Sequence, residues 1–127
     1  MQKPYSKTVL LIDDDPYILQ IVQTSLEVFS EWNPAIANSA KKGLEEIFRA
    51  KPDAILLDMM MPNIDGFTFL KYLQADHQLA GIPVVLLTSR VDLLETKKIV
   101  LLGVKGAIAK PFYAITLASQ ISQILGW

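Results

Sequence analysis

The sequence contains no cysteine and a single histidine, His77. The lack of thiols excludes disulfide bonds, thiolate zinc sites, iron–sulfur clusters and cysteine nucleophiles. One histidine cannot build a metal site that needs several imidazole ligands. Any metal ion that this chain binds must therefore be held by oxygen atoms.

The chain also has no large excess of positive or negative charge. Twelve basic and thirteen acidic side chains give a formal net charge of -1, so no bulk charge favours nucleic acid or an anionic membrane. Apolar runs such as 84–87 and 99–102 are far shorter than the roughly 20 residues of a membrane-spanning helix. The N-terminal run 9–12 is too short for a secretory signal. We predict a soluble, cytoplasmic protein that binds no membrane and does not bind nucleic acid directly.

The residues that are present predict one folded domain. The chain has 127 residues, of which 51% are hydrophobic and 20% charged, a size and composition typical of a single globular core. Short apolar runs rich in Val, Ile and Leu alternate with segments of helical period, which predicts parallel strands covered by helices. Strands are expected at 8–12, 34–37, 54–57, 84–88 and 105–109, and helices at 16–29, 39–49, 65–76, 92–102 and 113–125. The pattern predicts an α/β fold, a doubly wound five-stranded parallel sheet flanked by five helices.

Capping residues support these boundaries. Side chains that can cap a helix precede the first and second helices, and glycines follow the fourth and fifth: Asp15, Ser39, Gly103 and Gly126. The signals are weakest in the second unit. Its helix contains Gly43, which costs about 1 kcal/mol relative to alanine, and its strand offers only Ala35, Ile36 and Ala37.

Polar side chains follow four of the predicted strands. The first strand is followed by Asp13, Asp14 and Asp15, the third by Asp58, the fourth by Thr88 and Ser89, and the fifth by Lys110 and Pro111. Ligands bind beyond the carboxyl ends of the strands in open α/β sheets, so we expect these groups to converge. Asp15 is interpreted as a helix cap rather than a ligand.

The chemistry of this set favours a phosphoryl group and a hard cation. Neighbouring carboxylates raise one another's pKa or hold a cation, and oxygen donors favour Mg²⁺. Lys110 and Thr88 could neutralise and hydrogen-bond phosphoryl oxygens. Asp58 could be a nucleophile, because carboxylates form aspartyl phosphates. The methionine run 59–61 is interpreted as core packing rather than as a soft-metal site.

An ordered set of these residues is similar to that of a known family. In chain order the set is Asp13-Asp14, Asp58, Met59-Met60-Met61-Pro62, Asp65-Gly66, Thr88 and Lys110-Pro111. It resembles the receiver domain of two-component response regulators over residues 8–126. The resemblance implies a single receiver domain in 1–127, with a flavodoxin-like, CheY-like fold and the strand order 2-1-3-4-5.

The resemblance also implies a phosphoacceptor and a metal site. Asp58 matches the residue that takes a phosphoryl group from a phosphohistidine on a histidine kinase or histidine phosphotransfer protein. Asp14, Asp58 and the backbone carbonyl of Met60 match the direct ligands of Mg²⁺, and Asp13 matches an acidic position that reaches the metal through water. Such a chain catalyses only its own phosphorylation and slow dephosphorylation, so we do not predict a conventional enzyme.

Other positions match residues that contact or restrict the phosphoryl group. Thr88 matches the hydroxyl that hydrogen-bonds it, and Lys110 matches the ammonium that pairs with it. The Lys110–Pro111 peptide bond matches one that is cis in the family. Met60, Ser89 and Arg90 are predicted to modulate the site. Met60 and Arg90 could cover it against water, which predicts slow loss of phosphate.

The sequence departs from the family at one functional position. Ala107 stands where an aromatic switch residue usually lies, three residues before the lysine. A ring at that position therefore cannot report movement of Thr88. We hypothesise that Tyr113, or another group on the last helix, reports phosphorylation instead.

Two segments are unusually poor in charge. Residues 16–26 and 112–127 contain no charged side chain, and in the strand order given above the helices that they form lie on the same side of the sheet. They could be neutral helices kept in solution by polar residues. They could also form a partner surface, either for a homodimer or for a helical phosphodonor, because weakly charged surface is cheaper to desolvate.

Three other functions compete with the receiver interpretation. A receiver-like module could bind partners independently of phosphorylation, as Ala107 allows. A Mg²⁺-dependent phosphohydrolase would usually need a second acid or base and a cap domain. A flavin- or nucleotide-binding module would usually have a glycine-rich phosphate loop after the first strand, which this chain lacks. The sequence fits both a stand-alone regulator and a receiver within a longer protein.

Overall fold

The computed structural model describes residues 6–61 and 66–127. Within these ranges the strands are β1 (Thr8–Ile12), β2 (Asn33–Ala37), β3 (Ala54–Leu57), β4 (Val84–Thr88) and β5 (Gly106–Ala109). The α-helices are α1 (Pro16–Phe29), α2 (Ala40–Ala50), α3 (Gly66–Ala75), α4 (Thr96–Leu102) and α5 (Leu117–Leu125), and a 3₁₀ helix, η1 (Val91–Leu94), precedes α4. No helix in the described ranges has the length and apolar character needed to cross a membrane.

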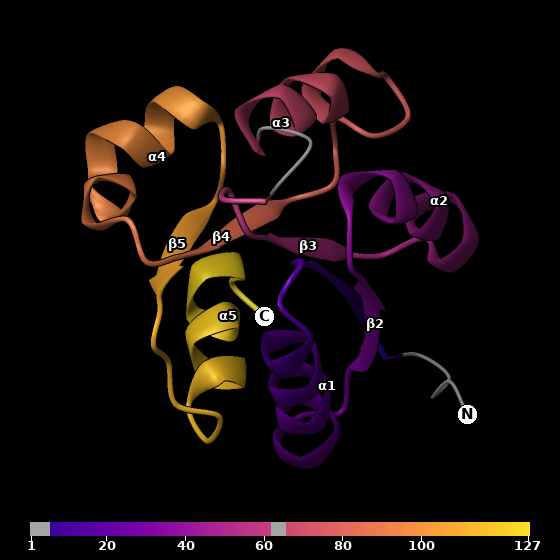
Figure 1. The fold of residues 1–127 in the computed structure, drawn as a ribbon, viewed down its shortest axis with the longest axis vertical. Coiled ribbons are helices and arrows are strands. Elements are labelled where there is room, and N and C mark those ends of the chain that lie inside the picture. Colours follow the sequence, from indigo (N-terminus) through magenta and orange to yellow (C-terminus); the bar gives the residue numbers. More distant parts are fainter. Residues whose placement is uncertain (1–5, 62–65) are drawn as a thin grey trace.

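The strands form one parallel sheet in the order β2-β1-β3-β4-β5, which confirms the predicted fold. Helices α1 and α5 lie side by side on one face, and α2, α3 and α4 cover the other (Figure 1). Successive side chains of a strand point to opposite faces. Leu10 and Ile12 of β1 accordingly pack against α2 and α3, whereas Val9 and Leu11 pack against α1 and α5. Burial on both faces explains the continuous apolar runs in the sequence.

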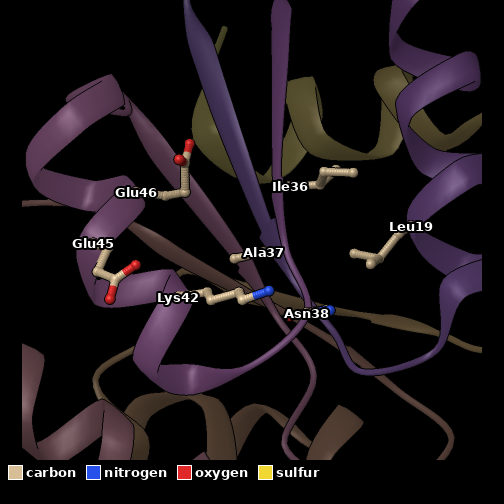
Figure 2. Close-up of a pocket in the computed structure, with 7 residues that line it drawn as sticks. All are labelled: Leu19, Ile36, Ala37, Asn38, Lys42, Glu45 and Glu46. Carbon is tan, nitrogen blue, oxygen red and sulfur yellow. The ribbon is translucent and has the colours of Figure 1, made fainter.

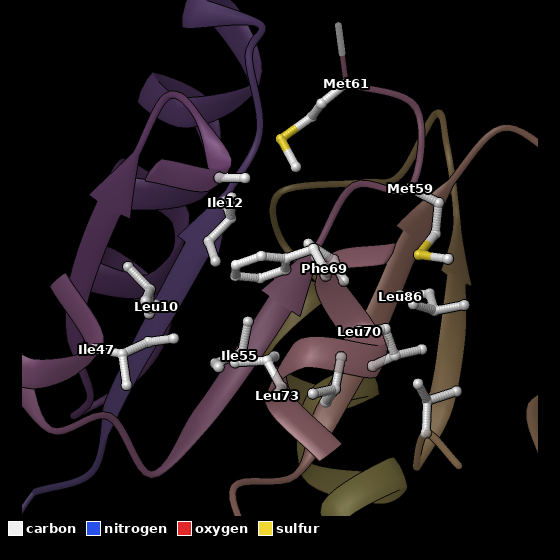
Figure 3. Packing of buried hydrophobic residues seen from close by; sticks show 14 of the residues in the cluster. Leu10, Ile12, Ile47, Ile55, Met59, Met61, Phe69, Leu70, Leu73 and Leu86 are labelled. Carbon is white, nitrogen blue, oxygen red and sulfur yellow. The ribbon is translucent and has the colours of Figure 1, made fainter. Parts of the chain in front are cut away.

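The core on the α2–α3 face is organised around Phe69. Its side chain is 1% exposed and reaches from α3 to the strands that carry Ile12 and Ile55 (Figure 3). Burying one such side chain stabilises the fold by roughly 1.5–3 kcal/mol. This packing fixes α3 close to the carboxyl end of β3, where the candidate site begins.

The second βα unit, where the sequence signals are weakest, is held by close packing. A Cβ atom on Gly43 would lie 2.7 Å from Cδ1 of Ile12, a distance that real contacts do not reach. The glycine lets α2 approach β1 closely, so tertiary packing compensates for its poor helix propensity. The predicted caps are also present: the side chains of Asp15 and Ser39 accept hydrogen bonds from the first turns of α1 and α2, and Gly103 and Gly126 end α4 and α5 with φ of 71°.

Two predicted helices were wrong in extent. The helix expected over 92–102 is instead η1 followed by α4, because Glu95 has an extended backbone between them. This break lets Leu93 turn into the core, where it is 1% exposed, and burial of a leucine outweighs one helical hydrogen bond. The helix expected over 113–125 begins only at Leu117. The carbonyl of Ala114 accepts a hydrogen bond from the Ser25 hydroxyl of α1 instead.

Smaller differences concern the ends of elements and the methionine run. The predicted strand 105–109 begins at Gly106, and the predicted helix 39–49 runs from Ala40 to Ala50. The predicted start of the third helix at residue 65 lies outside the described residues, and the helix ends at Ala75. Core packing of the methionines is confirmed for Met59 and Met61, which are 2% and 8% exposed, but was wrong for Met60, which is 58% exposed.

Candidate functional site

Backbone hydrogen bonds extend the sheet by one residue at its carboxyl edge and so fix the candidate site residues. The N–H groups of Asp13, Asp58 and Lys110 donate to carbonyls that end neighbouring strands, those of Ala37, Ile12 and Thr88 respectively, over 2.8–3.1 Å. The side chains that follow β1, β3 and β5 are therefore brought together as the sequence predicted. The regular ladder, rather than any loop, sets their positions.

Three carboxylates meet at this edge. One oxygen from each of Asp13, Asp14 and Asp58 lies within 4.8 Å of the other two. Asp13 and Asp58 are buried, and Asp14 is exposed to solvent. Three hard oxygen donors at this spacing, open to solvent on one side, fit a divalent cation such as Mg²⁺ that retains some of its water.

Lys110 supplies positive charge next to these carboxylates. Its Nζ lies 2.7 Å from Oδ2 of Asp13 and 3.8 Å from Oδ2 of Asp58. The other oxygen of Asp13 accepts the N–H of Asp15 at 2.9 Å, so Asp13 is held on both sides. Among the described residues that meet here, one ammonium opposes three carboxylates, which leaves this cluster with an excess of negative charge.

Burial raises the pKa of Asp58 above its ordinary value. The neighbouring charge of Asp13 raises that pKa further, whereas a hydrogen bond from the N–H of Met60 and the charge of Lys110 lower it. The net direction is upward because desolvation dominates. A second positive charge beside Asp58 would therefore be accommodated favourably.

Thr88 and Arg90 lie on the β4 side of the site. The Thr88 hydroxyl is buried and accepts the N–H of Arg90 at 3.0 Å. The Arg90 guanidinium pairs with Asp92 at 2.6 Å and lies over the ring of Phe67, 5.8 Å from its centroid. Ser89 is exposed between them. In this state, the charge of Arg90 is directed to η1 and α3.

The remaining predicted positions lie on β5 and the loop after it. Ala107 is partly buried and packs against the core on the α3 and α4 face. The Lys110–Pro111 peptide bond is cis. Tyr113 is 80% exposed in the loop before α5. Pro62 and Asp65, which belong to the family-like set, lie outside the described residues.

Sequence reasoning missed the roles of Ser25 and Gly66. Ser25 is 1% exposed, and its hydroxyl donates to the carbonyl of Ala114 at 2.5 Å, which tethers the loop after Lys110 to α1. A serine among the buried positions of an amphipathic helix was the available signal. A Cβ atom on Gly66 would lie 2.6 Å from Cα of Met59, so only glycine lets α3 start against the backbone that follows Asp58.

A separate hollow of about 280 Å³ lies at the β2 edge of the sheet. Figure 2 shows Leu19 of α1 on one side of it and Lys42, Glu45 and Glu46 of α2 on the other. None of the three clustered aspartates lines this hollow. The convergent polar groups predicted from the sequence lie at the carboxyl edge instead.

Comparison with known sequences identifies relatives over nearly the whole chain. Residues 9–122 match the family model of the response regulator receiver domain. The DNA-binding dual master transcriptional regulator RpaA of Synechocystis sp. is 32% identical over 117 residues, which cover 92% of this chain and 48% of RpaA. Response regulator Rre1 of the same organism is 30% identical over 125 residues, 98% of this chain and 53% of Rre1. The chain thus spans about half the length of these curated relatives.

Solved structures give the same result for the fold. The chemotaxis response regulator CheY4 of Vibrio cholerae superposes with a TM-score of 0.82 at 26% identity, over 94% of this chain and 98% of CheY4. The N-terminal domain of a response regulator receiver protein from Methanoculleus marisnigri superposes with a TM-score of 0.76 at 31% identity, over 95% and 98% of the two chains.

Proposed function

The chain belongs to the response regulator receiver family, whose role in two-component signalling is to accept a phosphoryl group, and from this premise we propose that Asp58 is its phosphoacceptor. The observation that carries the proposal is the position of Asp58. Its buried carboxylate lies 3.8 Å from the ammonium of Lys110 and beside Asp13 and Asp14. The donor would be a phosphohistidine on a histidine kinase or a histidine phosphotransfer protein.

The donor set fits Mg²⁺. Asp14, Asp58 and the backbone carbonyl of Met60 would hold the ion directly, and Asp13 would contact it through water. Bound there, Mg²⁺ would neutralise charge on the phosphoryl oxygens as phosphorus is transferred. The three clustered carboxylates support this assignment, because the positive charge of Lys110 balances only one of their negative charges.

The chain's own residues would perform the transfer as follows. A carboxylate oxygen of Asp58 attacks phosphorus, the new P–O bond forms, and the P–N bond to the donor imidazole breaks with its electron pair retained by the nitrogen. Lys110 then pairs with a phosphoryl oxygen, and the Thr88 hydroxyl donates a hydrogen bond to another. Asp13 keeps Lys110 oriented through the 2.7 Å contact.

The reaction would be limited to the chain's own phosphorylation and slow dephosphorylation. Met60 and Arg90 flank the site, and Ser89 lies exposed beside Thr88. A side chain over the acyl phosphate restricts the approach of water, which supports a long-lived phosphorylated form. We assign Met60, Ser89 and Arg90 to this modulation.

Because Ala107 has no aromatic ring, another residue would have to signal the phosphorylated state to a partner. We propose Tyr113 as the reporting group, because it is 80% exposed on the loop after Lys110 and is free to reach a partner surface. If partner binding did not depend on phosphorylation, the chain would instead be a phosphorylation-independent interaction module, which Ala107 allows.

We propose that the face formed by α1 and α5 contacts a second copy of the chain. The two helices lie side by side (Figure 1), and they carry few charges. Tyr17, Ile21 and Val28 of α1 are 75%, 43% and 64% exposed. Sedimentation with and without a phosphoryl analogue tests this contact, and a monomer in both states contradicts it. We further propose that residues 1–127 form a single receiver domain and that it functions in the cytoplasm.

The decisive experiment for Asp58 is incubation with Mg²⁺ and a small acyl phosphate, followed by intact mass measurement. The unmodified chain should gain one phosphoryl group, and Asp58→Asn should gain none. Asp53→Asn is a matched control, because Asp53 lies at the opposite end of β3, where its side chain accepts a hydrogen bond from the N–H of Thr8. Failure of the unmodified chain to gain a phosphoryl group would refute the proposal, and catalytic turnover of a phosphate ester would favour a phosphohydrolase.

A further inference from the structure

The methionine run after β3 has one exposed member between two buried ones. Met60 is 58% exposed, whereas Met59 and Met61 are 2% and 8% exposed. Figure 3 shows the side chains of Met59 and Met61 within the buried cluster that contains Phe69 and Leu86. Oxidants in solution therefore have access to one thioether of the run and are excluded from its neighbours.

The exposed thioether begins at the backbone that holds Asp58. The N–H of Met60 donates to Oδ1 of Asp58 at 3.0 Å, so the Met60 side chain starts a few bonds from the carboxylate. Lys110 pairs with Asp13, Arg90 pairs with Asp92, and the Met60 side chain is 58% exposed. A chemical change at the Met60 sulfur would therefore take place on an exposed side chain of the residue whose backbone binds the Asp58 carboxylate.

We propose that Met60 is a peroxide-sensitive modification site that controls how long the phosphoryl group stays on Asp58. This inference rests on the proposed role of Asp58. The sulfur lone pair attacks one oxygen of hydrogen peroxide, the O–O bond breaks, a sulfur–oxygen bond forms, and water leaves. Sulfur is oxidised by two electrons and the peroxide is reduced, and methionine sulfoxide reductases can reverse the change.

The modification inverts the chemical character of the side chain. A thioether is apolar and displaces water from the surface that it covers. A sulfoxide is polar, and its oxygen accepts hydrogen bonds from water. Oxidised Met60 would therefore admit and orient water beside the acyl phosphate instead of excluding it. We expect loss of phosphate to become about 2- to 10-fold faster. This is the change in rate expected when one ordinary hydrogen bond lowers the barrier to attack by water.

The buried neighbours make the selectivity measurable in one molecule. The chain is treated with hydrogen peroxide, the peroxide is removed with catalase, and peptide mapping locates each added oxygen. Met60 should be oxidised well before Met59 and Met61. Equal oxidation of the three residues would contradict the exposure argument and overturn the site.

The effect on phosphate lifetime is measured next. Oxidised and untreated chains are loaded with a small acyl phosphate and Mg²⁺, the donor is removed, and the phosphorylated fraction is followed by intact mass. The oxidised chain should lose phosphate faster, and treatment with a methionine sulfoxide reductase should restore the slower rate. Met60→Leu, which cannot be oxidised at this position, should show the same lifetime before and after peroxide, which controls for oxidation elsewhere.

The outcomes separate this inference from the proposed function. A chain that is oxidised at Met60, is phosphorylated and keeps its original phosphate lifetime overturns the inference and leaves Asp58 as phosphoacceptor. A chain that takes no phosphoryl group, even before peroxide, refutes the proposed function and the inference with it. A peroxide effect of equal size in Met60→Leu would also overturn the assignment to Met60.

Discussion

Asp58→Asn should stabilise the fold when divalent cations are absent. The carboxylate of Asp58 is buried beside Asp13, and this environment raises its pKa. A carboxyl whose pKa is raised by folding binds its proton more tightly in the native state, so its ionisation destabilises the fold as pH rises. Asparagine has nearly the same shape, can still accept the N–H of Met60 and carries no charge.

The size of the effect follows from the distances. With an effective dielectric constant of about 20, charges 4.8 Å apart repel by about 3.5 kcal/mol, so Asp13 repels Asp58 by at least that amount. The ammonium of Lys110 at 3.8 Å attracts Asp58 by about 4.4 kcal/mol on the same scale. These contributions nearly cancel, which leaves the cost of burying the charge and a screened repulsion from exposed Asp14. We expect a net gain of about 1–3 kcal/mol for Asp58→Asn.

Thermal unfolding in a chelating buffer measures this gain. Each kcal/mol shifts the midpoint by roughly 3–5 °C for a domain of this length, and the gain should disappear in acid, where Asp58 is protonated in both states. Saturating Mg²⁺ should offset most or all of this gain: a ligand at 100 times its Kd stabilises the fold by about 2.7 kcal/mol, and Asp58→Asn removes one of its ligands.

A matched control lies just before β3, where the side chain of Asp53 accepts a hydrogen bond from the N–H of Thr8. Asp53→Asn keeps the hydrogen bond to Thr8 and should change neither stability without metal nor the response to Mg²⁺. If Asp58→Asn lowered stability in the chelating buffer, the charge at Asp58 would be fully compensated, and the reasoning about the carboxylate cluster would be wrong.

Three further predictions follow from other contacts. Gly66→Ala should destabilise the fold by about 1–3 kcal/mol, read from urea unfolding, because its Cβ would meet the backbone of Met59; an unchanged midpoint would show that α3 can move away. Ser25→Ala should cost about 1–3 kcal/mol by leaving the partly buried carbonyl of Ala114 without its hydroxyl donor. No loss in unfolding free energy would mean that water replaces the hydroxyl. Replacing Met60 and Arg90 with small polar residues should speed the loss of phosphate measured by intact mass, and an unchanged rate would argue against shielding.

The hypothesis that Tyr113 reports phosphorylation is tested by removing its ring. Tyr113→Ala should remove the dependence of partner affinity on phosphorylation, as measured by titration of the phosphorylated and unmodified chains with the partner. An equally strong dependence after the substitution would exclude Tyr113 as the reporting group.

The fold and the identity of the clustered groups were predictable because local patterns carry them. Apolar runs at the strands and helical periodicity between them determine a parallel sheet, and the residue after each strand necessarily lies at its carboxyl edge. Asp13, Asp58 and Lys110 could therefore be placed together before any coordinates. The extent of the fourth and fifth helices was not predictable, because the burial of Leu93 and the bond from Ser25 to Ala114 join segments distant in sequence.

The sequence by itself determined which chemical groups are available: oxygen ligands without thiols, one lysine after the last strand, and no ring at Ala107. Only the tertiary structure decided how those groups differ from one another. It buries Asp13 and Asp58 but exposes Asp14, and it buries Met59 and Met61 but exposes Met60. Neighbouring identical residues acquire different properties because pKa and reactivity depend on solvent access and nearby charge, which packing alone sets.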